Sequence, residues 1–285
     1  MRIFDMKPIY NLRRGSVKVR SRHKILKQLG QDILEGLSVN DIAELGDMMV
    51  LVGCHHNFGL FPLVSSFCVG IQTEQFLDQN GRELWGMVKK PKGIADLMKN
   101  LSRVDVMLDT NISNRSWWEE QDLSPKDRAK LYFGPRIFPS EPRAFRSVPG
   151  GPNLFFGSMD GRRGSVIEQL GGVNVKVLPR GTYGTKLENE LNAAGTVINI
   201  HFDEGIYTEA PRLLTAYLAG KPIKSEMLGD PFVKGVHYIE IEGCITENAQ
   251  VIYDAFSQLV TEELSFASFI RSAFAETNQM SRTLS

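Results

Sequence analysis

The chain has 285 residues, of which 42% are hydrophobic and 23% charged, a composition typical of folded globular proteins and not of disordered ones. Lys and Arg number 33, and Asp and Glu also number 33, so the formal net charge is zero and no overall positive field favours nucleic-acid binding. A chain of this length usually forms about two domains. The cysteines Cys54, Cys68 and Cys244 form no C-x-x-C pair, so we expect a reducing compartment and no structural zinc.

Residues 1–27 are strongly basic, with nine Lys or Arg and one acid, Asp5. The segment has no apolar run of signal-peptide length, and polar residues interrupt the apolar stretch 48–70, so we predict neither a signal peptide nor a membrane-spanning helix. We therefore expect a cytoplasmic protein. The basic segment fits a solvated arm, the interpretation we favour, or peripheral contact with the inner face of an anionic membrane or with a phosphate-bearing acceptor.

Short apolar runs alternate with helical patterns along the chain. Strands are predicted at 48–53, 67–72, 104–109, 153–156, 173–178, 196–202 and 237–241, and helices at 39–45, 94–101, 165–170, 185–194 and 208–219. This alternation indicates an α/β fold with parallel sheets and right-handed crossovers. The amphipathic stretch 247–277 predicts a helix that packs back onto the first half.

Proline and glycine are densest at 134–152, which predicts a linker between two lobes. We divide the chain into an N-terminal Rossmann-like lobe at 1–145, a C-terminal Rossmann-like lobe at 146–262 and a returning C-terminal helix at 263–285. A cleft is expected between the lobes.

A glycine-rich turn follows the predicted strand at 153–156 and contains Gly157, Ser158, Arg162 and Arg163. Ligands of α/β proteins bind beyond the carboxyl ends of the strands, and guanidinium groups bind phosphates. The turn therefore predicts a phosphate site, although its glycine spacing matches neither G-x-G-x-x-G nor a P-loop. The alternative is a solvated turn with two surface arginines.

A second polar group follows the strand at 196–202 and comprises His201, Glu204, Glu209 and Arg212. Glu209 is a candidate to accept hydrogen bonds from ribose hydroxyls, and Thr208 is the expected N-cap of the helix after it. The alternative is an ordinary intrahelical ion pair between Glu209 and Arg212.

The stretch 153–226 resembles the nucleotide-sugar-binding half of GT-B glycosyltransferases. The resemblance rests on the FFGS turn, the paired arginines, the VINIHF strand, the EAPR helix start and the AGKPIKSE ending. In the first half, GIQTEQ and VDVMLD are similar to segments of the same enzymes, so the resemblance covers about residues 48–226 and is greatest to bacterial group 1 glycosyltransferases that build surface polysaccharides.

The resemblance implies a GT-B fold with a shortened N-terminal lobe that binds the acceptor. It implies that Gly157, Ser158 and Arg163 lie near the donor phosphates, His201 and Glu204 near the transferred sugar, and Glu209 near the ribose. The family's carboxylate pair with seven intervening residues is absent, because Arg212 stands eight positions after Glu204.

Candidates for a catalytic base in the first half are His55, His56 and Glu74, because an inverting enzyme needs a group that takes the proton of the acceptor hydroxyl. If the strand at 48–53 continued, the two histidines would point in opposite directions. We expect the pair Trp117 and Trp118 to pack a helix onto its sheet.

These observations predict a metal-independent glycosyltransferase that transfers a sugar from a nucleotide-sugar donor to a saccharide or lipid-linked acceptor, without a cofactor. No D-x-D motif indicates a metal site, and arginines can neutralise the leaving group instead. The alternative is a non-catalytic nucleotide- or glycan-binding protein of the same fold. A nicotinamide oxidoreductase is disfavoured because the glycine fingerprint is missing.

Overall fold

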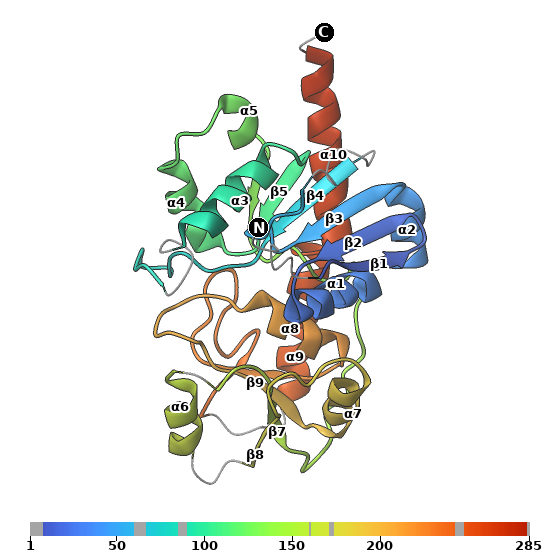
Figure 1. Ribbon diagram of the computed structural model, residues 1–285. Helices are drawn as coiled ribbons and strands as arrows, with labels where there is room; N and C mark the ends of the chain where they lie inside the picture. The colour runs from blue at the N-terminus through green and yellow to red at the C-terminus, as the bar shows by residue number, and fades with distance from the viewer. Residues whose placement is uncertain are drawn as a thin grey trace. The chain divides into compact units, whose positions relative to one another are not determined.

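The computed structural model describes residues 8–59, 67–84, 90–159, 161–170, 174–242 and 248–283 (Figure 1). The chain divides into two compact units. Unit 1 comprises Met1–Phe76, Gly86–Ser140 and Leu264–Ser285, and unit 2 comprises Leu77–Trp85 and Glu141–Glu263. The change of unit after Ser140 falls inside the proline- and glycine-rich segment 134–152.

Unit 1 contains a six-stranded sheet in the order β1-β2-β3-β4-β5-β6. The strands are β1 (Tyr10–Arg14), β2 (Val17–Ser21), β3 (Met48–Val52), β4 (Phe67–Gln72), β5 (Val106–Asp109) and β6 (Leu131–Phe133). Strands β2 to β6 are parallel, whereas β1 pairs with β2 in the antiparallel direction. The prediction of a purely parallel sheet is therefore wrong for this unit, because a hairpin adds one antiparallel strand at its edge.

The hairpin is made by the basic N-terminal segment. Val17 and Val19 alternate with half-buried basic side chains along β2, so the apolar positions face the core. Gly15 has a φ of +58° in the turn. Arg14 binds the carbonyl groups of Leu34 and Leu37 at the end of helix α1 (Lys24–Gly36). The prediction of a solvated arm is thus wrong for residues 10–27.

Further helices of unit 1 connect or flank its strands. They are α2 (Val39–Leu45), α3 (Pro91–Leu101), a short 3-10 turn at Ile112–Asn114, α4 (Arg115–Glu119), α5 (Pro125–Arg128) and α10 (Phe266–Thr283). The predicted helix at 39–45 is confirmed, with a capping box between Ser38 and Asp41. Trp117 and Trp118 are both buried, which confirms that this pair packs against the core.

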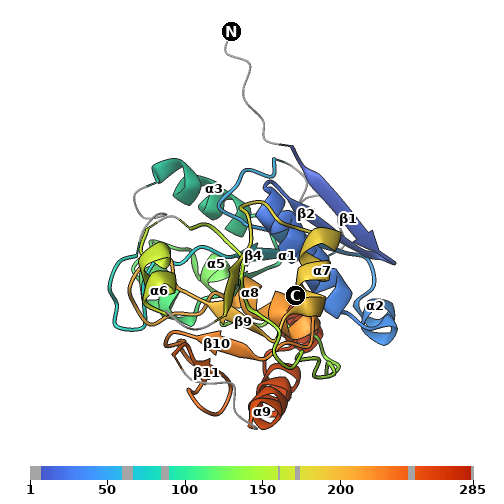
Figure 2. The same cartoon turned by 90° about the horizontal axis from the view of Figure 1, so that it is seen from below.

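Unit 2 contains a five-stranded, wholly parallel sheet in the order β11-β10-β9-β7-β8. Its strands are β7 (Asn153–Phe155), β8 (Val175–Val177), β9 (Thr196–Asn199), β10 (Ile223–Ser225) and β11 (Ile239–Glu240). Its helices are α6 (Arg163–Gln169), α7 (Thr185–Ala193), α8 (Ala210–Leu218) and α9 (Ala249–Glu262). Figure 2 shows β9, β10 and β11 next to one another. The α/β class and a generally Rossmann-like architecture are confirmed.

The strand order of unit 2 creates a topological switch point. From β7 the chain proceeds to β8 on one side, and the next strand, β9, lies on the other side of β7. Crossovers that diverge in this way leave room beyond the carboxyl ends of the two strands, where open α/β sheets bind ligands. Unit 1 has no such reversal among its described strands, because they follow one another in sequence order.

The predicted amphipathic segment 247–277 forms two helices instead of one. Helix α9 belongs to unit 2 and α10 to unit 1, with the break at Glu263–Ser265. Main-chain hydrogen bonds join Phe138 to Leu264 and Phe266 on either side of Ser265. Within unit 1, Arg271 of α10 pairs with Asp41 and Glu44.

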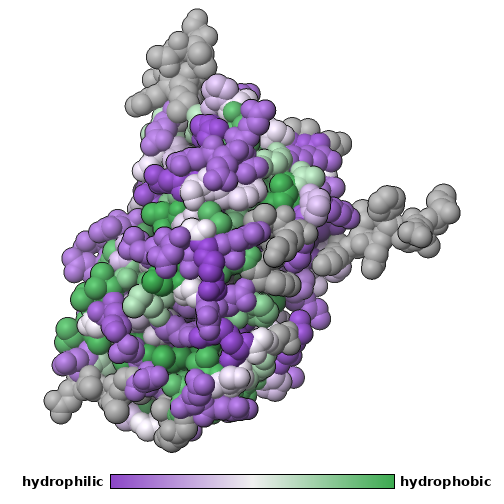
Figure 3. Space-filling view, turned by 90° about the vertical axis from the view of Figure 1, so that its left-hand side faces the viewer, coloured by the Kyte–Doolittle hydropathy of each residue, from purple (hydrophilic) through white to green (hydrophobic). Residues whose placement is uncertain are grey.

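No described helix is long and apolar enough to cross a membrane. On the face drawn in Figure 3, hydrophobic and hydrophilic side chains are interspersed.

Gly53 closes β3 and leads to the histidine pair, and we predict that Gly53→Ala destabilises the protein by about 2–4 kcal/mol. Its φ is +84°, and an added Cβ would overlap with Leu26 Cδ1 inside the core. Gly46→Ala is the matched control, because Gly46 has a φ of +65° but no atom within 4 Å of the added Cβ. Urea denaturation of both variants measures the effect, and equal losses would show that the contact with Leu26 costs nothing.

Candidate functional site

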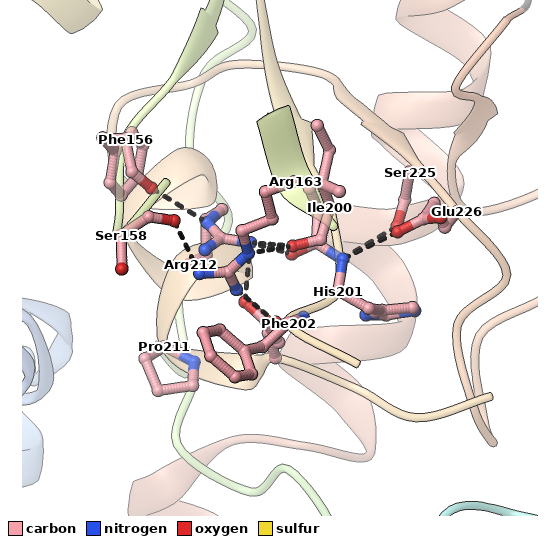
Figure 4. A network of polar contacts seen from close by, with 12 residues as sticks. Phe156, Ser158, Arg163, Ile200, His201, Phe202, Pro211, Arg212, Ser225 and Glu226 are labelled. Atoms are coloured by element: carbon pink, nitrogen blue, oxygen red, sulfur yellow. Dashed lines mark hydrogen bonds and ion pairs between the residues drawn. The ribbon is translucent and has the colours of Figure 1, made fainter. Parts of the chain in front are cut away.

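The candidate site lies where three neighbouring strands of unit 2 end (Figure 4). Residues 156–158 follow β7, residues 200–202 follow β9, and Glu226 follows β10. Because these strands are parallel and adjacent, their carboxyl ends lie at one edge of the sheet. This edge includes the switch point between β7 and β9.

Arg163, the first residue of α6, is almost completely buried at this edge, with 5% of its surface exposed. Its Nε donates to the carbonyl of Ile200 at 3.0 Å, its Nη1 to the carbonyl of Ser158 at 3.1 Å, and its Nη2 to Glu209 Oε1 at 2.7 Å. The guanidinium group also lies 5.4 Å from the ring centroid of Phe202. Arg163 is therefore fixed in position by two loops and one helix start.

Arg212 of α8 belongs to the same cluster. Its Nη1 lies 2.6 Å from Asn199 Oδ1, 3.2 Å from the Ile200 carbonyl oxygen and 2.6 Å from Glu209 Oε2. Its Nε donates to the carbonyl of Phe156 at 3.2 Å. One carbonyl oxygen thus accepts hydrogen bonds from two buried arginines, and Figure 4 shows both side chains converging on it.

Glu209 is the N-cap of α8 and joins the two arginines, whereas the expected N-cap was Thr208. Pro211 lies in the first helical turn, where its missing N–H has no partner to lose. Glu209 Oε1 also accepts from the main-chain N–H of Phe202 at 3.2 Å. Burial raises the pKa of Glu209, but the charges of Arg212 and Arg163 outweigh it and hold the pKa below its usual value.

Gly157 lies beside the two guanidinium groups. Its φ is +145°, and a Cβ at this position would lie 3.0 Å from Arg212 Nη2 and 3.7 Å from Arg163 Nη1. Any side chain here would occupy the space beside both cations. The cluster of two arginines and one glutamate carries a net charge of +1, so this space suits an anion.

A second polar group adjoins the first. Arg162 Nη1 donates to Glu226 Oε2 at 2.8 Å, and the main-chain N–H of His201 donates to the same oxygen at 2.7 Å. Burial raises the pKa of Glu226, but the hydrogen bonds from Arg162 and His201 outweigh it and lower the pKa. Glu226 was not among the predicted site residues, although it directly follows the strand Ile223–Ser225 and is the last residue of the AGKPIKSE segment.

The His201 ring is buried, with Nε2 2.9 Å from the carbonyl oxygen of Met227. Because a carbonyl only accepts, Nε2 carries the proton and Nδ1 is the acceptor of the neutral ring. Burial lowers the pKa of His201 despite the nearby Glu209, so the ring is neutral at pH 7. Among the described residues, none forms a hydrogen bond with Nδ1.

Glu204 differs from the other predicted residues of unit 2, because it is exposed. Its carbonyl accepts a hydrogen bond from Arg82 Nη2, so segment 77–85 is joined to the loop after β9. The main-chain N–H of Gln79 also donates to the carbonyl of Ile206, at 2.8 Å. No pattern in the sequence predicts that this distant segment binds here.

The first-half candidates lie at the carboxyl edge of the unit 1 sheet. His55 Nε2 is 3.5 Å from Glu74 Oε1, and the rings of His55 and His56 are 4.1 Å apart. The histidines lie in a turn after β3 and do not point in opposite directions as a continued strand would require. Burial raises the pKa of Glu74, and Lys90 and His23 only partly oppose this.

The structure therefore brings together Gly157, Ser158, Arg163, Glu209 and Arg212 in one cluster, and Arg162, His201 and Glu226 in the adjoining one. His55, His56 and Glu74 form a separate group in unit 1. Within the described part of the chain, no three His, Cys, Asp or Glu side chains are grouped as metal ligands.

Comparison with known proteins adds no relative to this description. No protein-family model matches the sequence, and no curated protein sequence matches it.

The buried position of Glu209 predicts that Glu209→Gln lowers the free energy of unfolding by about 3 kcal/mol, because one of the two arginines then faces an amide N–H₂ group. The lowered pKa means that Glu209 contributes its stability above the unfolded pKa of about 4.3 and loses it as pH falls through the folded value. Below pH 4 the free energy of unfolding, measured by urea denaturation, should therefore fall less steeply in the variant than in the unaltered protein.

Glu190→Gln is the control for this measurement. Glu190 forms an exposed ion pair with Lys176 in the same unit, and such pairs contribute less than about 1 kcal/mol. Equal losses in the two variants would contradict the importance of the buried cluster.

Proposed function

We propose that the protein is a glycosyltransferase and that unit 2 binds the diphosphate group of a nucleotide-sugar donor beside Gly157. The observation that supports this most strongly is the pair of buried guanidinium groups, Arg163 Nη1 and Arg212 Nη2, next to the space that a side chain at position 157 would fill. The pair lies at the switch point of a parallel sheet, where nucleotides bind in such folds.

The electrostatics of the cluster suit a leaving diphosphate. Glu209 neutralises one of the two arginine charges and holds both side chains in place, which leaves one net positive charge for the ligand. When the sugar is transferred, the bond between its anomeric carbon and the phosphate oxygen breaks, and the electron pair stays on the diphosphate. Fixed guanidinium groups stabilise this developing charge without reorganising, so the transfer requires no metal ion.

In this proposal Glu209 has a different task from the one that the resemblance implies. Both of its carboxylate oxygens already contact arginines, so it orients the phosphate-binding groups instead of accepting from the ribose. His201 Nδ1 offers an acceptor for a sugar hydroxyl in the neighbouring cluster. The donor then contacts both clusters of unit 2.

The acceptor, a saccharide or a lipid-linked saccharide, is assigned to unit 1. Its hydroxyl oxygen forms the new bond to the anomeric carbon, and its proton passes to a base of the His55–Glu74 pair, whose facing atoms are 3.5 Å apart. The resemblance of 153–226 to donor-binding halves of glycosyltransferases supports the division of tasks. The expected cytoplasmic location, with contact to the inner face of a membrane, remains part of this proposal.

The second candidate is a non-catalytic nucleotide- or glycan-binding protein. The engagement of Glu209 by two arginines favours it, because the carboxylate is then not available as the family's ribose ligand. Turnover separates the two: release of nucleoside diphosphate from a nucleotide sugar in the presence of acceptor supports the enzyme, and binding without turnover supports the second candidate.

We predict that one of the nucleoside diphosphates UDP, GDP, ADP and dTDP raises the melting temperature of the protein, with the monophosphate CMP as a negative reference. A ligand at 100 times its Kd stabilises by about 2.7 kcal/mol. Gly157→Ala should weaken this binding at least about tenfold, a cost of about 1.4 kcal/mol, because the methyl group occupies the space beside the arginines.

Gly181→Ala is the matched control for this experiment. Gly181 lies in the same unit with a φ of +88°, but an added Cβ meets no atom within 4 Å. Both variants therefore carry backbone strain, and only one fills the proposed site. Equal nucleotide affinity in the two variants, or no shift with any nucleotide, would contradict the proposed phosphate site.

We further predict that His55→Gln lowers the transfer rate at least about 100-fold, in line with the loss of a general base. Nucleotide affinity should be unchanged, because His55 belongs to unit 1 and the phosphate site to unit 2. Steady-state kinetics with nucleotide titration measures both. Full activity of the double variant His55→Gln/His56→Gln would exclude a histidine base in this turn.

A further inference from the structure

The side chain of Asn114 binds the main chain at both Glu74 and Phe76. Asn114 Nδ2 donates to the carbonyl of Glu74 at 2.9 Å, and its Oδ1 accepts from the N–H of Phe76 at 2.8 Å. Gln72 Nε2, at 3.2 Å, and Asn111 Nδ2, at 3.4 Å, also reach the Glu74 carbonyl. Residues 73–76 lie beyond the end of β4, so side-chain amides take the place of a neighbouring strand.

Asp109, at the end of β5, fixes the orientation of that amide. Asn114 Nδ2 lies 3.1 and 3.0 Å from the two carboxylate oxygens of Asp109. If the amide were reversed, its oxygen would face the Asp109 carboxylate and the Glu74 carbonyl, which are all acceptors. Because both Asp109 and Asn114 are wholly buried, such an arrangement would leave several polar atoms unpaired.

The Asp109 carboxylate is itself held only by neutral donors. Trp118 Nε1 donates to Oδ2 at 2.8 Å, and the main-chain N–H of Asn111 donates to Oδ1 at 3.0 Å. Burial raises the pKa of Asp109 to about 7, although the hydrogen bonds from Trp118, Asn114 and Asn111 oppose this. The clamp formed by Asp109 and Asn114 therefore includes a carboxylate that takes up a proton near neutral pH.

The clamp acts on the residue that faces His55. Glu74 Oε1 lies 3.5 Å from His55 Nε2, and the charges of Lys90 and His23 also act on the Glu74 carboxylate. Phe76, the other residue that Asn114 holds, is the last residue of unit 1 before the chain enters unit 2. The clamp therefore holds the Glu74 carbonyl and the Phe76 N–H, the main-chain groups on either side of Gln75.

We propose that Asp109 and Asn114 are positioning residues that hold Glu74 beside His55 and thereby set the geometry of an acid–base pair for an acceptor hydroxyl. The role of Glu74 and His55 in taking a proton from an acceptor hydroxyl rests on the proposed function. The positioning itself does not, and it is tested without any turnover.

The test is an NMR titration of the full chain, in which the ring protons of His55 report the titration of Glu74. The His55 signals are assigned by their loss in His55→Gln, and the Glu74 inflection by its loss in Glu74→Gln. Asn114→Ala and Asp109→Asn should each reduce the amplitude of that inflection at least twofold, because Glu74 then moves away from His55. A full inflection in both folded variants would overturn the proposal.

Asn153→Ala is the matched control. Asn153 is another buried asparagine that binds a main-chain carbonyl, that of Asn174 at 3.1 Å, but it belongs to unit 2. The Glu74 inflection should keep its full amplitude in this variant. A loss equal to that of Asn114→Ala would show that general destabilisation, and not positioning, moves Glu74, and would overturn the proposal.

A second measurement uses the unaltered protein, in case the variants do not fold. The indole proton of Trp118 reports the ionisation of Asp109, and the amide proton of Phe76 reports the Asn114 contact. Both signals should shift with one midpoint near pH 7. A Phe76 amide that does not follow the Trp118 midpoint would overturn the role of Asp109. A protein that shows this coupling but binds no nucleotide would refute the proposed function alone.

Discussion

The carbonyl oxygen of Ile200 and the carboxylate of Glu209 hold two arginines together at the end of β9. Two like charges are stable this close in a buried place only when acceptors surround them, because desolvation of an unpaired ion costs several kcal/mol. Unit 2 supplies those acceptors from the loops after β7 and β9 and from the start of α8. The positions of these three segments are therefore coupled, and none can shift without leaving a buried cation unpaired.

Because the two arginines are held in place, the position beside them depends on the absence of a side chain at Gly157. The arginines are occupied on the sides that face Phe156, Ser158 and Ile200, and Gly157 leaves the remaining side without a Cβ. The sequence predicted that Gly157, Arg163, Glu209 and Arg212 belong to one site, because strands of a parallel sheet bring their carboxyl ends together. It did not predict that Glu209 would be shared between the arginines, since that depends on where a helix begins: the N-cap of α8 is Glu209, one residue after the expected cap at Thr208.

Elements with buried apolar runs were predictable, and elements whose apolar face is narrow were not. Strands β3, β4 and β9 are buried at every position and are plain in the sequence. The hairpin β1–β2 was missed because two arginines end β1 and basic residues alternate with valines in β2, so basic residues dominate the composition of the segment. Glu226 was missed because a single carboxylate after a strand is common, and only the tertiary structure shows that Arg162 reaches it. Segment 77–85 belongs to unit 2 through main-chain bonds, which leave no pattern in the sequence.

The two sheets differ in how polar groups are arranged at the carboxyl ends of their parallel strands. In unit 2 the order reverses at β7, so the polar groups gather at the reversal and their charges are paired beside Gly157. In unit 1 the parallel strands follow in sequence order, and the polar residues after β4 and β5 bind one another through Asp109, Asn114 and the main chain of Glu74. Unit 2 therefore has a fixed cationic site at Arg163 and Arg212. Unit 1 instead has two carboxylates, Asp109 and Glu74, whose pKa values are raised by burial. Fixed cations suit the binding of an anion, and buried carboxylates with raised pKa values suit the movement of protons.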